Sequence, residues 1–136
     1  MSQESLDAVR KAYEAINSGD PGPVLEAVDE GMEFHEPVSL PYGGKYRGPE
    51  GMEQLLSRLA GTWEGLHLEI EELLDAGDCV AIRGRLQARS KSTGEEVDEP
   101  YLEVLRFREG KAIEGWIQID TAKVLQALGR RMAATV

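Results

Sequence analysis

Hydrophobic spacing divides the chain into a helical first half and a second half built of strands. Over residues 6–19 the apolar side chains recur every three or four positions until an Asn-Ser-Gly sequence ends the pattern, which predicts an amphipathic helix. Asp20 and Pro21 favour the start of a short second helix that ends at Gly31. A third helix is predicted over residues 49–61, from a proline to a glycine.

Between the second and third helices the pattern predicts a brief strand over residues 32–36. The next segment, residues 39–48, is rich in proline and glycine and has the composition of a mobile flap. After the third helix, apolar and polar residues alternate, which is typical of half-buried strands. Turn sequences separate four such runs, at residues 66–70, 79–88, 97–107 and 112–119. Because the connections are too short for crossover helices, we expect an antiparallel meander.

This order of elements is typical of an α+β domain, with helices packed on one face of a curved antiparallel sheet. We expect a single domain over residues 1–129, with a last helix capped by Thr121 and a loose tail over residues 130–136. Any space left between helices and sheet would form a cavity, and its polar lining would come from strand residues that point inward.

The composition narrows the class of protein. A chain of 136 residues with 41% apolar and 29% charged residues fits one folded domain. Cys79 is the single cysteine, which excludes an internal disulfide and fits a reducing cytoplasm. The net charge of −10 disfavours nucleic acid and anionic membranes as partners. The N-terminal region lacks an apolar run, so we expect no signal peptide, no membrane span and a cytoplasmic location.

The residues that carry chemistry are carboxylates. The sequence contains no phosphate-binding loop, no dinucleotide-binding glycine motif and no metal-ligand spacing, so we expect neither a metal nor an organic cofactor. Glu36 and Glu103 share strand faces with apolar residues, and Asp120 closes the last strand. If these carboxyls converge in an apolar pocket, at least one pKa should be raised, and that group could act as a general acid.

Each candidate also has a structural interpretation. Acids at strand ends are commonly solvated, and Asp120 could cap the last helix. The candidate ligand-binding residues could equally be core or surface residues: Tyr13, Phe34, His35, Trp63, Trp116 and Gln118. Arg83 and Arg85 alternate on one strand face and are expected to meet solvent or a partner subunit, which favours a homodimer.

The chain resembles the ketosteroid-isomerase and SnoaL-like branch of the nuclear transport factor 2-like superfamily over nearly its whole length. The resemblance includes a Phe-His-Glu-Pro sequence at residues 34–37 and a Tyr-Arg-Gly-Pro-Glu-Gly sequence at residues 46–51. The other matching segments are residues 12–20, 77–78, 104–107, 110–114, 116–120 and 125–129.

The resemblance implies a conical α+β barrel, usually dimeric, around an apolar pocket. It implies that Glu36 matches the proton-abstracting aspartate of ketosteroid isomerase and that Glu103 matches the protonated aspartate of its oxyanion hole. Asp120 is similar to the acid/base aspartate of SnoaL-like cyclases. Tyr13 lies one residue out of register with the isomerase oxyanion tyrosine.

Two hypotheses follow from the sequence. The first is an enzyme of the isomerase, cyclase or dehydratase type that moves a proton on a small apolar carbonyl compound by general acid/base catalysis. In it, Glu36 abstracts the proton and protonated Glu103 or Asp120 stabilises the enolate. The second is a non-catalytic module of the same fold that binds a small ligand or dimerises, because one fold hosts many functions.

Overall fold

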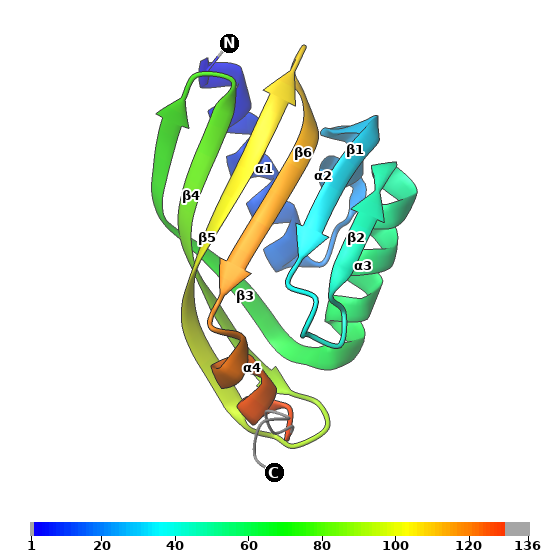
Figure 1. Cartoon of the computed structure of the whole chain (residues 1–136), viewed down its shortest axis with the longest axis vertical. Coiled ribbons are helices and arrows are strands. Elements are labelled where there is room, and N and C mark those ends of the chain that lie inside the picture. The colour runs from blue at the N-terminus through cyan, green and yellow to red at the C-terminus, as the bar shows by residue number, and fades with distance from the viewer. Residues whose placement is uncertain (1, 130–136) are drawn as a thin grey trace.

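A curved six-stranded sheet with two open edges forms one layer of the computed structural model, and the helices α1 to α3 form the other layer (Figure 1). The structure describes residues 2–129, so the expected tail over residues 130–136 lies outside it. The sheet has the strand order β2-β1-β6-β5-β4-β3. The elements are α1 (Ser2–Ser18), α2 (Gly22–Glu26), β1 (Val28–Glu36), β2 (Gly44–Arg47), α3 (Gly48–Thr62), β3 (Trp63–Ala76), β4 (Cys79–Ser90), β5 (Glu96–Arg108), β6 (Lys111–Ile119) and α4 (Thr121–Ala127).

The expected mixed α+β fold and its four-stranded antiparallel meander are confirmed. Each of β3, β4 and β5 pairs in antiparallel fashion with the next strand along the chain. Gly77, with a φ of 82°, lies in the tight turn between β3 and β4, where a positive φ favours glycine. One pair differs from an all-antiparallel sheet, because β1 runs parallel to β6. No hairpin links these two strands, so hairpin geometry does not fix their relative direction.

The segment between α1 and α3 differs from the sequence prediction. The second helix ends at Glu26 instead of Gly31, and β1 already begins at Val28, which is buried. Residues 39–48, expected to be a loop, contain the edge strand β2, in which only Tyr46 is buried. The missed strand has four residues, which is too short to show a clear alternation.

The core lies between the helices and the inner face of the sheet. The apolar stripe of α1 places Val9 and Tyr13 there, and α3 contributes Leu55. Asn17 fastens the end of α1 to β3, because its side chain both donates to the Leu68 carbonyl (3.0 Å) and accepts from the Leu68 N–H (2.8 Å). Over residues 2–129, no helix is long and apolar enough to cross a membrane.

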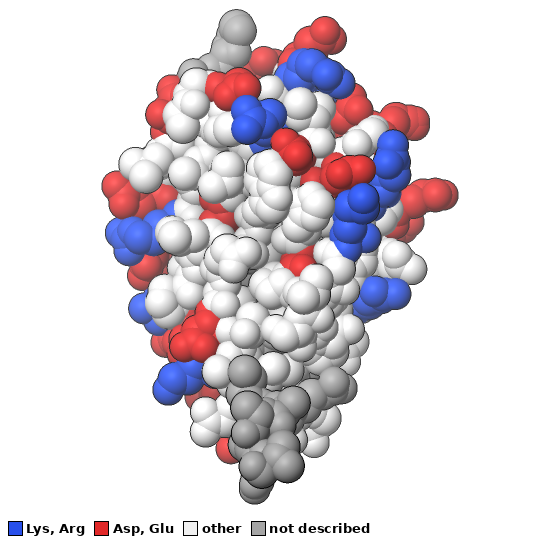
Figure 2. All heavy atoms as spheres, viewed as in Figure 1, with Lys and Arg blue, Asp and Glu red and all other residues white. Residues whose placement is uncertain are grey.

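The outer face of the sheet, turned away from α1 to α3, has a largely uncharged centre, in which a few acidic atoms show, and charged margins (Figure 2). His35 and Trp116 stack on this face, with their ring centroids 5.7 Å apart. Leu102 is 59% exposed. Arg83 and Arg85 are partly exposed to solvent, as expected, and they also form ion pairs within the chain, to Glu71 and Glu72 of β3 and Asp98 of β5.

Candidate active site

Two glutamates point from the sheet into the interior beneath the helices. Glu36 is the last residue of β1 and is 8% exposed. Glu103 lies in the middle of β5, on the same face as the buried Tyr101. The strand β6 runs between β1 and β5, and its Gly115 leaves room for the Phe34 ring, which a Cβ there would meet at 2.6 Å. Gly115 and the Phe34 ring thus form an apolar surface between the two glutamates.

A chain of hydroxyl groups ends on Glu103. The Tyr13 hydroxyl of α1 donates to Glu103 Oε1 (2.5 Å), and the Tyr101 hydroxyl donates to that of Tyr13 (2.7 Å). Tyr101 can reach across β4 because its cross-strand partner is Gly84, where a Cβ would meet the Tyr101 hydroxyl at 2.7 Å. A hydrogen bond from a tyrosine favours the ionised carboxylate.

Glu36 lies in a different environment. Its pKa is raised to about 8, first by burial and second by the charge of Glu103, and no hydrogen bond from residues 2–129 offsets these two effects. Burial also raises the pKa of Glu103, to about 7, although the hydrogen bond from Tyr13 opposes the rise. Both carboxyls therefore change protonation state close to neutral pH. Groups with such pKa values in an apolar setting can act as general acids or bases.

A second polar cluster lies beside Glu36, and sequence reasoning missed it. Tyr42, in the segment between β1 and β2, is 3% exposed, and its hydroxyl accepts a hydrogen bond from Trp63 Nε1 (3.3 Å). The Tyr46 hydroxyl donates to the Tyr42 carbonyl (2.6 Å) and accepts from Arg58 (2.8 Å). The charge of Glu36 contributes to a raised Tyr42 pKa, after the larger effect of burial. Tyr42 escaped notice because it stands in a proline- and glycine-rich segment without periodicity.

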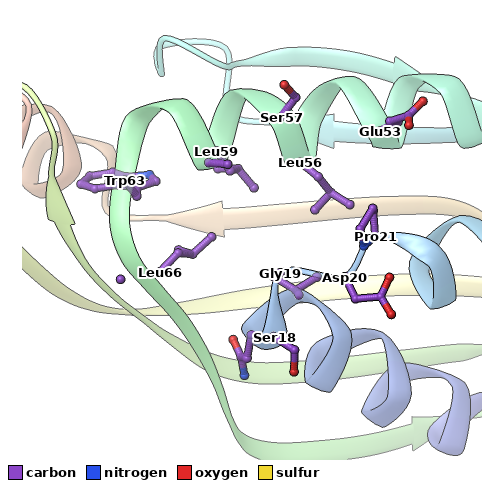
Figure 3. Close-up of a pocket in the computed structure, with 14 residues that line it drawn as sticks. Ser18, Gly19, Asp20, Pro21, Glu53, Leu56, Ser57, Leu59, Trp63 and Leu66 are labelled. Atoms are coloured by element: carbon purple, nitrogen blue, oxygen red, sulfur yellow. The ribbon is translucent and has the colours of Figure 1, made fainter.

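Two cavities approach these groups. The wider encloses about 560 Å³ between the end of α1, the apolar side of α3 and the start of β3, where Leu56, Leu59, Trp63 and Leu66 line it (Figure 3). A smaller one of about 70 Å³ lies deeper, against Tyr13, Phe34 and Glu103. Ile16 lines both cavities, and Glu36 lines neither. The wide cavity has the size typical of a small-molecule site.

The structure brings some of the sequence candidates together and separates others. Tyr13, Phe34, Glu36, Trp63 and Glu103 lie on the inner side. His35 and Trp116 lie on the outer face with the exposed Gln118, because alternation along a strand sends neighbouring side chains to opposite faces.

Asp120 is exposed, and its side chain accepts a hydrogen bond from the Lys123 N–H (3.2 Å) at the start of α4. The helix cap is therefore Asp120, the alternative interpretation, and not Thr121. Within the described part of the chain, no group of three His, Cys, Asp or Glu side chains could hold a metal ion.

The comparison with protein families finds a SnoaL-like domain over residues 9–115. The chain belongs to this family. The family lies within the nuclear transport factor 2-like (NTF2-like) superfamily, which the sequence resemblance had indicated. No curated protein matches the sequence of this SnoaL-like chain.

Solved structures share the SnoaL-like fold at low sequence identity. An NTF2-like protein from Burkholderia thailandensis is 27% identical, with a TM-score of 0.85 over 91% of this chain and 96% of the other. A protein with a ketosteroid isomerase-like fold from Catenulispora acidiphila, solved with trimethylamine, is 19% identical (TM-score 0.80; 90% and 92% covered). AclR, a putative hydroxylase from Streptomyces galilaeus, is 21% identical (TM-score 0.79; 97% and 89% covered). The last two likenesses concern the fold alone.

Proposed function

We propose that this SnoaL-like protein is an enzyme that transfers a proton on a small, largely apolar carbonyl compound, using Glu36 and Glu103 and no metal or organic cofactor. One observation carries the proposal. Two carboxyls on the inner face of one sheet influence each other electrostatically, and their pKa values of about 8 and about 7 straddle the pH at which such catalysts work. The SnoaL-like fold by itself does not select this chemistry, because related folds serve several functions.

The proposed reaction needs one proton shared by the pair. The higher pKa of Glu36 places this proton mainly on Glu36, so the reactive form is the less populated one, in which Glu36 is ionised and Glu103 holds the proton. The ionised Glu36 takes a proton from the carbon next to the carbonyl, the electron pair of the broken C–H bond forms a carbon–carbon double bond, and the π pair of the carbonyl moves to its oxygen. The neutral Glu103 donates a hydrogen bond to that oxygen while it carries negative charge. Return of the proton to the same or another carbon completes the exchange or the isomerisation, with no net oxidation.

The second candidate is binding of an apolar ligand without turnover. The observation that favours it is that neither Glu36 nor Glu103 lines the wide cavity at Leu56 and Trp63, whose carboxyls are those of Asp20 and Glu53. A ligand confined to this cavity would meet neither proposed catalytic group. Burial alone would then explain the raised pKa values.

We also propose that the protein forms a two-fold homodimer through the outer face of the sheet. The support for this is the exposed Leu102, beside the half-buried Val104 and Trp116, on a face that none of α1 to α3 covers. Exposed apolar patches of this kind mark interfaces, and a two-fold axis would pair the patch with itself.

The experiment that tests the enzyme proposal follows deuterium incorporation next to the carbonyl of a panel of cyclic ketones in D₂O by NMR. We expect exchange above the buffer rate for the wild type and a loss of about 10²- to 10⁴-fold for Glu36→Gln, which keeps the side-chain volume but removes the base. The matched control is Glu33→Gln, on the same strand but paired at the surface with Lys45 and Arg47.

The pH profile gives a second readout. Activity should be greatest between the two pKa values of about 7 and about 8, because the pair then holds one proton. If the protein binds members of the panel but shows no exchange, the enzyme proposal is wrong and the binding function is supported. Equal exchange rates for the wild type and Glu36→Gln would exclude Glu36 as the base.

A further inference from the structure

The chain has four tyrosines, and their hydroxyl groups differ in whether they donate a hydrogen bond to another group. Tyr101 donates to Tyr13, Tyr13 donates to Glu103, and Tyr46 donates to the carbonyl of Tyr42. The hydroxyl of Tyr42 only accepts a hydrogen bond, from Trp63 Nε1. Within residues 2–129 its own proton has no acceptor, although the side chain is 3% exposed.

A buried O–H group without an acceptor is costly, and native proteins rarely keep one without a use. The bond from Trp63 fixes where the Tyr42 oxygen lies and occupies one of its lone pairs. The Tyr42 hydroxyl can therefore still donate one hydrogen bond through its own proton. The hydroxyl is within electrostatic range of Glu36, and Trp63 also lines the wide cavity. Tyr42 itself lines neither of the two cavities described above, so its link to the wide cavity is the hydrogen bond from Trp63, and its link to the proposed base is electrostatic.

The segment that carries Tyr42 is built to hold it in place. The Leu40 N–H donates to the Pro37 carbonyl (3.1 Å), and the Gly43 N–H donates to the Leu40 carbonyl (2.8 Å). A side chain at residue 43 would collide with the Pro37 carbonyl, since a Cβ would lie 2.1 Å from it. The Tyr46 hydroxyl, held by Arg58, fixes the Tyr42 backbone. A hydroxyl positioned in this way suits a preorganised donor.

We propose that Tyr42 donates a hydrogen bond to an oxygen of the bound ligand, at the Glu36 end of the site, with Trp63 as the residue that positions its hydroxyl. The ligands that fit are flat apolar molecules with a carbonyl, enol or phenol oxygen. This inference rests on the proposed proton-transfer function, in which that oxygen gains negative charge and Tyr42 stabilises it together with Glu103.

The test uses 2-naphthol, a flat apolar phenol whose oxygen resembles that of an enolate, and measures its binding by fluorescence titration. We expect Tyr42→Phe to weaken binding by about two- to ten-fold, the usual effect of losing a hydrogen bond between neutral groups. Its melting temperature should fall somewhat, because the substitution also removes the oxygen that accepts from the buried Trp63 Nε1. Far-UV circular dichroism at the titration temperature therefore checks that the variant is folded. Trp63→Phe should weaken binding less, because it removes only the group that positions the oxygen.

The matched control is Tyr46→Phe, which removes a hydroxyl from the same region but takes away the donor of the Tyr42 carbonyl. We expect this variant to melt at a lower temperature and to lose less affinity for 2-naphthol than Tyr42→Phe. Wild-type affinity in Tyr42→Phe overturns the proposal, and so does a wild-type protein that does not bind 2-naphthol up to its solubility limit. Because binding requires no turnover, this result is independent of the ketone exchange that tests Glu36.

Discussion

At the scale of single residues, a hydrogen bond from one neighbouring side chain gives two glutamates different pKa values. Glu36 and Glu103 are both glutamates on inner strand faces, yet only Glu103 accepts a hydrogen bond from Tyr13. The alternation of the strands was enough to predict that both point inward among apolar residues. The hydrogen bond that separates their pKa values joins residues 90 positions apart in the sequence, which no local pattern could show.

The raised pKa values predict how stability depends on pH. In the folded protein Glu36 and Glu103 bind protons more tightly than at the ordinary value of 4.5, so the folded state holds more protons than the unfolded state between that pH and about 7 to 8. The free energy of unfolding should therefore fall as the pH rises through this window, by about 1.4 kcal/mol per pH unit for each carboxyl.

Urea denaturation at several pH values between 5 and 8, a range chosen to span the expected shifts, measures this dependence. Glu36→Gln should remove about half of the slope and should be more stable than the wild type near pH 8, where the ionised Glu36 destabilises the fold. Glu33→Gln should keep the full slope. A wild-type stability that does not change across the window would contradict the buried pair.

At the scale of elements, glycines decide how closely the strands and side chains approach. Gly84 on β4 faces Tyr101 on β5, and its missing side chain is what lets the Tyr101 ring lie across the strand toward Tyr13. The sequence predicted both strands but gave no reason to single out Gly84, because cross-strand contacts depend on register. The hydroxyl chain to Glu103 therefore depends on a residue without a functional group.

Gly84→Ala tests this dependence. The new methyl group would overlap the Tyr101 ring, so we expect a loss of about 1–3 kcal/mol in the free energy of unfolding. We also expect a shift in the pKa of Glu103, because Tyr13 loses the donor that orients it. Denaturation and NMR titration of glutamate ¹³Cδ measure the two effects. The control is Gly61→Ala in α3, where a Cβ has open space, and this change should cost nothing or stabilise by up to about 1 kcal/mol.

At the scale of the whole molecule, the sheet has one face covered by helices and one face without such a cover. Arg83 and Arg85 form their ion pairs with acidic residues of the same chain, so these two arginines no longer support the prediction of a partner subunit. The argument for a dimer now depends on the apolar side chains of Leu102, Val104 and Trp116 on the outer face, whose centre is largely uncharged (Figure 2).

The proposed dimer predicts a mass of two chains in light scattering at micromolar concentration. Leu102→Glu should reduce this to the mass of one chain while leaving the far-UV circular dichroism unchanged, because Leu102 is 59% exposed in the single chain. Val38→Glu is the control, since Val38 is 87% exposed in the segment after β1 and outside the sheet. A single-chain mass for the wild type would exclude the dimer at that concentration.

The sequence by itself determined the elements and their faces. Helical spacing gave α1 and α3, alternation gave the meander, and the two together gave an α+β fold with Glu36 and Glu103 directed inward, because these patterns depend on neighbours along the chain. Only the tertiary structure decided which residues meet. In the folded chain Tyr13 donates a hydrogen bond to Glu103, and Tyr42 lies near Glu36. Trp116 lies on the outer face, and Asp120 caps α4. These contacts depend on strand register and on packing between distant segments, and a local pattern carries neither.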